Sequence, residues 1–187
     1  MAISISNNID KNRIIFIFGG ITREMSLSVI QQLLAFNATS NEDITIYINS
    51  EGGSVYEALA IIDVMNCIDS DVSIIVCGQA CSAASLITVC GTKGKRYITP
   101  YAQIMIHNLR SSSEGTPQQM ADRLDLMVKQ ENILSNLYVQ NTNCDLADIQ
   151  TFFTKDTWFD AENALDKGIV DKILGSNENN GLEYEIK

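Results

Sequence analysis

The chain has 187 residues and a formal net charge of −10, and its composition is 45% hydrophobic and 19% charged. This length is enough for one domain with a single core, and the balance of residue types is that of a globular protein. The acidic charge argues against non-specific binding to nucleic acid, which requires clustered Lys and Arg. We therefore expect one domain over residues 1–187 and no nucleic-acid partner.

The cysteines and the first residues of the chain indicate in which cellular compartment the protein works. The five cysteines include no CxxC pair and the chain has one histidine, so a zinc site is not expected. Most of the cysteines lie in apolar runs, which predicts free buried thiols in a reducing compartment. The first residues lack the basic and apolar regions of a signal peptide, and no uncharged apolar run approaches the ~18 residues of a membrane span. These features predict a cytoplasmic protein without a membrane segment.

Periodicity predicts alternating strands and helices. Short β-branched runs that end at Gly, Ser or Asp are typical of strands, and apolar residues at helical spacing behind a Ser or Thr cap are typical of helices. In chain order we expect a strand over 13–18, a helix over 22–36, a strand over 43–49, a helix over 54–68, a strand over 71–77, a small-residue segment over 78–85 leading into a helix to about 90, strands over 96–98 and 103–106, a long helix over 116–141 with Pro117 in its first turn, helices over 145–153 and 161–167, and a strand or turn over 169–174. This alternation predicts an α/β domain with largely parallel pairing.

Two residues are candidates for nucleophilic catalysis. His107 is the only histidine and ends a predicted strand, so any histidine general base must be this residue. Ser82 lies where a buried strand turns into a helix, a position that lifts a side chain out of a sheet and leaves the following backbone N–H groups free to stabilise an oxyanion. The alternatives remain open: a structural histidine at a strand end, and a small serine at a tight packing contact.

A double glycine follows the second predicted strand. Gly52 and Gly53 are suited to exposing backbone N–H groups, although an ordinary tight turn would have the same sequence. The third glycine of a dinucleotide-binding fingerprint and the GK[ST] of a P-loop are both missing, so these nucleotide sites are excluded. The residues alone do not identify a catalytic carboxylate, because nothing separates Asp156 from Asp145, Asp148 or Asp160.

Five segments together resemble the proteolytic subunit of the Clp peptidase family, in that family's order and over about 13–174. They are Tyr47-Ile-Asn-Ser-Glu-Gly-Gly53, Gly78-Gln-Ala-Cys-Ser82, Gly94-Lys-Arg96, Ile104-Met-Ile-His107, and Asp156-Thr-Trp-Phe-Asp-Ala161 followed by Lys167-Gly-Ile-Val-Asp171. The resemblance implies a serine endopeptidase with Ser82 as nucleophile, His107 as base and Asp156 as the carboxylate that orients the base. It also implies an oxyanion hole made by the backbone N–H groups of Gly53 and Ala83, with no metal and no cofactor.

The resemblance also implies a fold and an assembly. The family fold is a spiral of strand–strand–helix units shared with the crotonases, from which a strand–helix handle protrudes. The handle would span about 108–141, with a strand over 108–114 and a helix over 116–141, between an N-terminal segment over 1–12 and a polar tail over 175–187. The family forms two stacked seven-membered rings around the active sites, and a separate Clp-type ATPase delivers unfolded protein to them.

Several positions depart from the family pattern. These are Glu51 for the usual Pro, Ser-Ala-Ala-Ser85 for Ser-Met-Gly-Ala, Asn108-Leu109 for Gln-Pro, Ser111-Ser112 for a glycine pair, and Lys155 for an Arg whose bidentate pairing Lys does not reproduce. The Ser-Ala-Ala-Ser, His-Asn and Trp158 segments resemble phage peptidases that mature capsid precursors, whereas Gly-Lys-Arg96 resembles the housekeeping subunit, so both substrate classes stay open. Alternative functions are a non-catalytic ring subunit of the same fold and, more remotely, a crotonase-type acyl-CoA enzyme.

Overall fold

The computed structural model describes residues 12–110 and 114–175. The side chains of the first two strands alternate between buried and exposed positions. In β1 (Ile14–Phe18) and β2 (Ile44–Ser50) every second side chain is buried, and the side chains between them are partly or fully exposed. β-Branched residues fit such a half-buried pleated surface. The isoleucines on the inner face of both strands are completely buried and form the centre of the core.

Capping residues begin the helices at the positions that the sequence predicts. The Thr22 side chain accepts a hydrogen bond from Met25 N–H at the start of α2 (Arg23–Asn37), and the Ser54 side chain does the same for Glu57 N–H at the start of α3 (Val55–Cys67). Such caps satisfy backbone donors that have no partner within the helix.

The described residues form one seven-stranded sheet. The other elements are α4 (Ala83–Val89), α5 (Pro117–Asn141), α6 (Leu146–Phe153), α7 (Ala161–Asp166), β3 (Val72–Cys81), β4 (Arg96–Ile98), β5 (Gln103–Ile106), β6 (Thr157–Phe159) and β7 (Lys172–Ile173). The order β1-β2-β3-β4-β7 is parallel throughout, β5 pairs in parallel with β3, and β6 pairs antiparallel with β5. The first half of β3 pairs with β4 and its last residues pair with β5, so the end of β3 and the end of β5 lie side by side.

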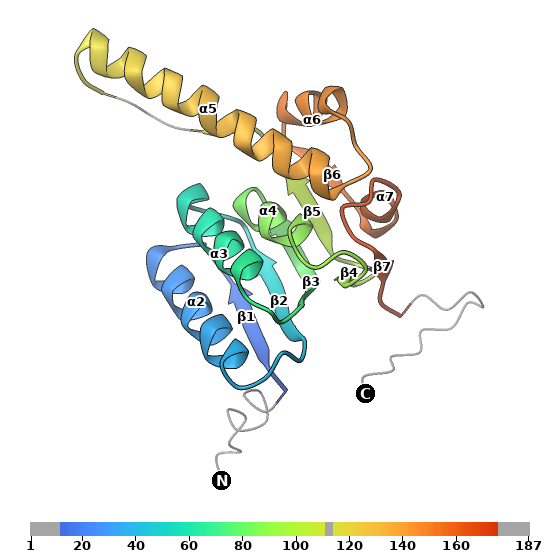
Figure 1. The fold of residues 1–187 in the computed structure, drawn as a ribbon. Helices are drawn as coiled ribbons and strands as arrows, with labels where there is room; N and C mark the ends of the chain where they lie inside the picture. The colour runs from blue at the N-terminus through green and yellow to red at the C-terminus, as the bar shows by residue number, and fades with distance from the viewer. Residues whose placement is uncertain (1–11, 111–113, 176–187) are drawn as a thin grey trace.

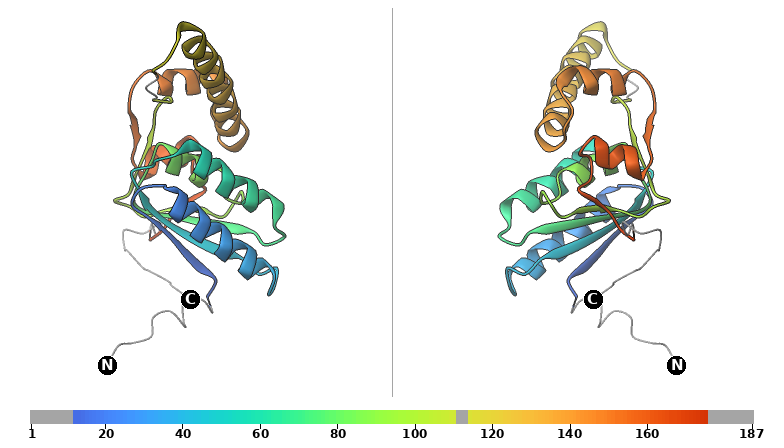
Figure 2. Two further views of the ribbon diagram at one scale, coloured as in Figure 1. Left: turned by 90° about the vertical axis from the view of Figure 1, so that its left-hand side faces the viewer. Right: turned by 90° about the vertical axis from the view of Figure 1, so that its right-hand side faces the viewer.

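Helices α2 and α3 cover one face of the sheet, and α5 extends away from the body of the molecule (Figures 1 and 2). Its buried residues all lie in its C-terminal third. The rest of α5 leaves large apolar side chains in contact with solvent, namely Met120, Leu124, Leu126, Val128 and Ile133, which are between 43% and 61% exposed.

The α/β class and the predicted helices are confirmed, and two expectations about strands need correction. β3 does not end at Cys77 but continues to Cys81, because Gln79 to Cys81 gain a parallel partner in β5. Strand β6 was not predicted, and it exists through antiparallel pairing with β5. The handle strand expected over 108–114 finds no strand partner within the single chain at 108–110 and 114, and 111–113 lie outside the described residues, so it stays a prediction.

The expectation of buried cysteines holds only in part. All five thiols are free, but Cys67 is exposed, because it ends α3 on the solvent side. Burial raises the pKa of the Cys90 thiol to about 12, so this side chain is an inert part of the packing. Within 12–110 and 114–175, no helix is both long enough and apolar enough to cross a membrane.

Candidate active site

Ser82 occupies a strained backbone turn between β3 and α4. Its φ of 54° and ψ of −121° are unusual for a residue other than glycine and cost about 1–3 kcal/mol, so they persist only where the surroundings impose them. Two backbone hydrogen bonds do so: Ser82 N–H donates to the Met105 carbonyl at 2.8 Å, and the Ser82 carbonyl accepts from Ser85 N–H at 2.9 Å. The turn directs the serine side chain out of the sheet.

The double-glycine turn after β2 packs directly against this elbow. A Cβ atom on Gly52 would lie 2.5 Å from the Cys81 carbonyl oxygen and 2.9 Å from Ser82 Cβ, and the φ of Gly52 is +93°. Both the close approach and the backbone angle require glycine. The Ser50 hydroxyl accepts a hydrogen bond from Gly52 N–H at 3.0 Å and fixes the turn.

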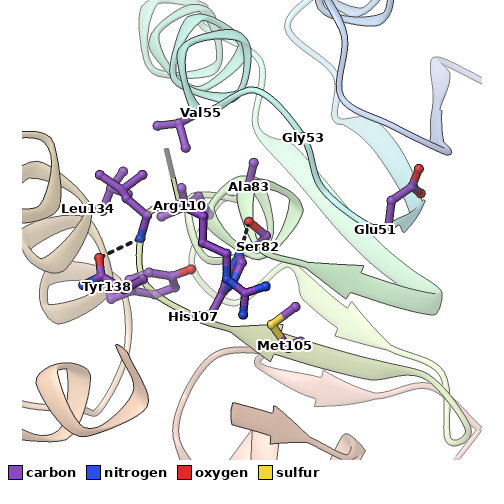
Figure 3. Close-up of a pocket in the computed structure, with 13 residues that line it drawn as sticks. Glu51, Gly53, Val55, Ser82, Ala83, Met105, His107, Arg110, Leu134 and Tyr138 are labelled. Atoms are coloured by element: carbon purple, nitrogen blue, oxygen red, sulfur yellow. Dashed lines mark hydrogen bonds between the residues drawn. The ribbon is translucent and has the colours of Figure 1, made fainter. Parts of the chain in front are cut away.

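His107 lies within hydrogen-bonding distance of Ser82. It directly follows β5, whose pairing with the end of β3 brings the two residues together although 25 positions separate them. His107 Nε2 is 2.7 Å from Ser82 Oγ, and Figure 3 shows this contact as a dashed line. When Nδ1 carries the ring proton, Nε2 is the acceptor and the Ser82 hydroxyl is the donor.

Asp156 approaches the other nitrogen of the same ring from the residue before β6. Its Oδ1 is 3.4 Å from His107 Nδ1, but the two atoms do not form a hydrogen bond of normal geometry. The same oxygen accepts a short charged hydrogen bond from Arg110. Asp156 therefore lies near His107, but its hydrogen bond is with Arg110.

The local environment keeps His107 neutral. Burial lowers the pKa of the imidazole, the charge of Arg110 lowers it further, and Asp156 opposes both effects. The net pKa lies below the ordinary value of histidine. A neutral imidazole is the form that can accept a proton from a serine hydroxyl.

This balance predicts the effect of Arg110→Gln on pH dependence. Because the positive charge lowers the His107 pKa, its removal is expected to raise that pKa and to shift the acid limb of the kcat/KM profile to higher pH. A pH series with a short peptide ester measures the shift. Arg23→Gln, the same charge change on the exposed surface of α2, should leave the limb in place; an unmoved limb in Arg110→Gln would show that the arginine does not act on His107.

Gly53 and Ala83 lie beside Ser82. Gly53 pairs with Ile21 through Ile21 N–H to Gly52 O and Ser54 N–H to Ile21 O, and these bonds do not use Gly53 N–H. Ala83 is the first residue of α4, where an N–H group has no acceptor within the helix. Both residues line the pocket that contains Ser82.

That pocket has a volume of about 400 Å³. Leu134 and Tyr138 of α5 form one side of it, and Glu51 and Gly53 lie across from them beyond Ser82 (Figure 3). Its apolar wall also includes Val55, Leu86, Met105 and Leu109. A cleft of this kind can hold an extended segment with an apolar side chain next to the serine.

The structure thus brings Ser82, His107 and Asp156 together, with Gly53 and Ala83 beside them. Sequence reasoning missed Arg110 and Tyr138. A cation three positions after the only histidine was the available signal for Arg110. Nothing in the sequence pointed to Tyr138, because it lies 56 positions after Ser82 and only the tertiary packing brings it close.

Comparison with known proteins gives one consistent result. A family model described as Clp protease matches residues 1–177. An ATP-dependent Clp protease proteolytic subunit from Lactococcus lactis subsp. lactis (strain IL1403) is 39% identical over 185 residues, covering 97% of this chain and 92% of that protein. Proteins of the same name from Streptococcus salivarius and Streptococcus pyogenes serotype M5 (strain Manfredo) are 38% and 40% identical, each covering 90% of this chain and 87% of its own length.

Proposed function

The chain belongs to the Clp protease family and is a serine endopeptidase, and we propose that Ser82, His107 and Asp156 are its catalytic triad. The observation that carries this assignment is the 2.7 Å contact between Ser82 Oγ and His107 Nε2 at a strained strand-to-helix turn. A nucleophile and a base at this distance are the minimum that acyl transfer requires. The same contact favours an active peptidase over a non-catalytic ring subunit.

In the proposed reaction His107 Nε2 accepts the Ser82 proton while Oγ attacks the carbonyl carbon of the scissile peptide bond. The N–H groups of Gly53 and Ala83 stabilise the resulting oxyanion. His107 then donates the proton to the departing amine, which leaves an acyl-enzyme. Water, deprotonated by His107, hydrolyses this ester and restores the Ser82 hydroxyl.

Asp156 has the role of holding the His107 tautomer. Its Oδ1 stabilises the proton on Nδ1 and, later, the imidazolium cation. The 3.4 Å between Asp156 Oδ1 and His107 Nδ1 is longer than a normal hydrogen bond. Catalytic hydrogen bonds that are long in a free enzyme often shorten only when substrate is bound. We propose that substrate binding brings Asp156 onto Nδ1 and loosens its pair with Arg110.

We propose that the whole chain is one peptidase domain that works inside a ring assembly. The support is the set of exposed apolar side chains on α5, which a solitary chain would leave in water. On this proposal α5 packs against other copies, two seven-membered rings stack, and a cytoplasmic Clp-type ATPase delivers unfolded protein; the name of the relatives, ATP-dependent proteolytic subunits, supports such a partner.

One experiment tests the peptidase activity and the ring assembly together. Purified protein is separated by size with light-scattering detection, and each fraction is assayed against a short fluorogenic peptide and a dye-labelled unfolded protein. We expect both activities at a mass many times the 20.6 kDa of one chain. Activity confined to a 20.6 kDa species would contradict the ring, and inactivity in every fraction would contradict the proposed triad.

A further inference from the structure

The carbonyl group of Ser82 receives two hydrogen bonds from one residue. Ser85 donates its backbone N–H at 2.9 Å and its side-chain hydroxyl at 2.6 Å to the Ser82 oxygen. Ser85 is completely buried, at a place where a polar group must have a partner.

The Ser85 hydroxyl continues the contact to helix α5. Its oxygen lies 2.7 Å from the hydroxyl of Tyr138, which is only 2% exposed. A serine hydroxyl has one hydrogen, and here that hydrogen goes to the Ser82 carbonyl; the tyrosine must then donate to Ser85. Only this direction gives both buried hydroxyl hydrogens an acceptor among the described residues.

The result is a chain of donors from Tyr138 through Ser85 to Ser82. Burial raises the pKa of the Tyr138 phenol, so it stays protonated and remains a donor throughout the working pH range. The ring of Tyr138 is held edge-on against Phe153 at 6.1 Å, which fixes the position of the hydroxyl. Hydrogen bonds in such a chain polarise one another and become stronger together.

The planarity of the peptide bond carries this effect into the pocket. The Ser82 carbonyl and the Ala83 N–H belong to one planar trans peptide, so they point in opposite directions. Fixing the carbonyl on the buried side therefore fixes the N–H on the other side. Electron withdrawal at the carbonyl oxygen also makes that N–H a stronger donor.

We infer that Ser85 and Tyr138 are positioning residues that orient and polarise the Ala83 N–H group as an oxyanion donor. The inference rests on the proposed function, because it assigns a purpose to the Ala83 amide. It also links helix α5, whose other end is exposed, to the geometry of the nucleophile (Figures 1 and 3). Neither residue touches the reacting atoms, so both act through the peptide between Ser82 and Ala83.

The test compares Ser85→Ala, Tyr138→Phe and the double variant, each of which removes hydroxyl groups with little change of shape. We expect kcat to fall about tenfold for Ser85→Ala and about threefold for Tyr138→Phe, a fraction of the effect of losing a whole oxyanion donor, with KM within about twofold of wild type. Because both hydroxyls act in series, the double variant should resemble Ser85→Ala. Affinity for a peptide aldehyde, whose adduct places an oxygen in the oxyanion position, should fall in parallel with kcat.

Thr88→Val is the matched control. Thr88 is also completely buried, and its hydroxyl donates to a carbonyl of α4, that of Ala84, at 2.9 Å and not to that of Ser82. Thr88→Val should lower the melting temperature about as much as Ser85→Ala and leave kcat unchanged.

Three results would each overturn the inference while wild type stays active. They are a kcat equal to that of wild type in all three test variants, a rise in KM without loss of kcat, and additive losses of kcat in the double variant. Wild type that neither hydrolyses peptide nor binds the aldehyde would instead overturn the proposed function, and the inference with it.

Discussion

Ser82→Ala is expected to lower peptide hydrolysis by about 10³-fold or more, because no other nucleophile lies within reach of His107 Nε2 among the described residues. The protein should remain folded. Alanine can form the same backbone hydrogen bonds at position 82, and the serine whose hydroxyl is lost is half-buried rather than part of the core. Initial rates with a fluorogenic peptide and a thermal melt measure both effects, and the melting temperature should change by no more than about 2 °C.

The control for this variant is Ser73→Ala near the start of β3, the strand that ends just before Ser82. Ser73 is also mostly buried and donates to the Lys95 carbonyl at 3.2 Å, far from the pocket. It should keep wild-type turnover. Retention of more than about a tenth of wild-type activity in Ser82→Ala would show that another group performs the attack.

Asp171→Asn is expected to destabilise the fold by about 3–5 kcal/mol, the usual consequence of leaving a buried cation without its partner. Arg96 is only 2% exposed and forms a bidentate pair with Asp171, through Nη2 to Oδ1 at 2.6 Å and Nε to Oδ2 at 2.9 Å. The same guanidinium donates to the last carbonyls of α4 and α5, at Val89 and Asn141. Loss of the carboxylate therefore weakens the junction of both helices with strands β4 and β7. Urea unfolding followed by circular dichroism measures the change.

The pH dependence of this pair has a definite sign. Burial raises the pKa of Asp171, but the hydrogen bonds and charge of Arg96 outweigh it, and the net pKa is lowered. A lowered folded-state pKa stabilises the protein above the unfolded-state pKa, and this contribution is lost as the pH falls through the folded-state value. The difference between wild type and Asp171→Asn should therefore be constant at neutral pH and shrink in acid.

Asp71→Asn supplies the comparison for the ion pair. Asp71 pairs with Lys95 at 2.8 Å, but the two side chains are 51% and 32% exposed. Water and salt screen such a pair, so its loss should cost no more than about 1 kcal/mol. An equal loss of stability in both aspartate variants would contradict the importance assigned to the burial of Arg96.

Most of the fold was predictable because its signals are local. Alternating isoleucines indicate β1 and β2, and Thr22 and Ser54 mark the starts of α2 and α3. Strand β6 carries no such signal: Thr157–Phe159 is three residues long and depends on its partner β5. The last residues of β3 were missed for the same reason, because Gly78 and its small neighbours become a strand only by pairing with β5.

The site was predictable in its types of residue but not in its geometry. The single histidine limited the choice of base to His107, whereas the carboxylate could be chosen only by resemblance. The structure supplies a physical reason for that choice: Asp145, Asp148 and Asp160 all accept or share hydrogen bonds at helix N-termini, and Asp156 is the one that faces the histidine. The pairing of Asp156 with Arg110 follows from tertiary contacts alone.

The most direct test of the catalytic assignment is the intact mass of the protein after treatment with a fluorophosphonate, which reacts with activated serines. Wild type and Ser82→Ala are treated side by side, and the adduct is located by peptide mapping. We expect one adduct per wild-type chain, on Ser82, and none on the variant. An adduct on both proteins, or on neither, would contradict the assignment of Ser82 as the nucleophile that His107 activates.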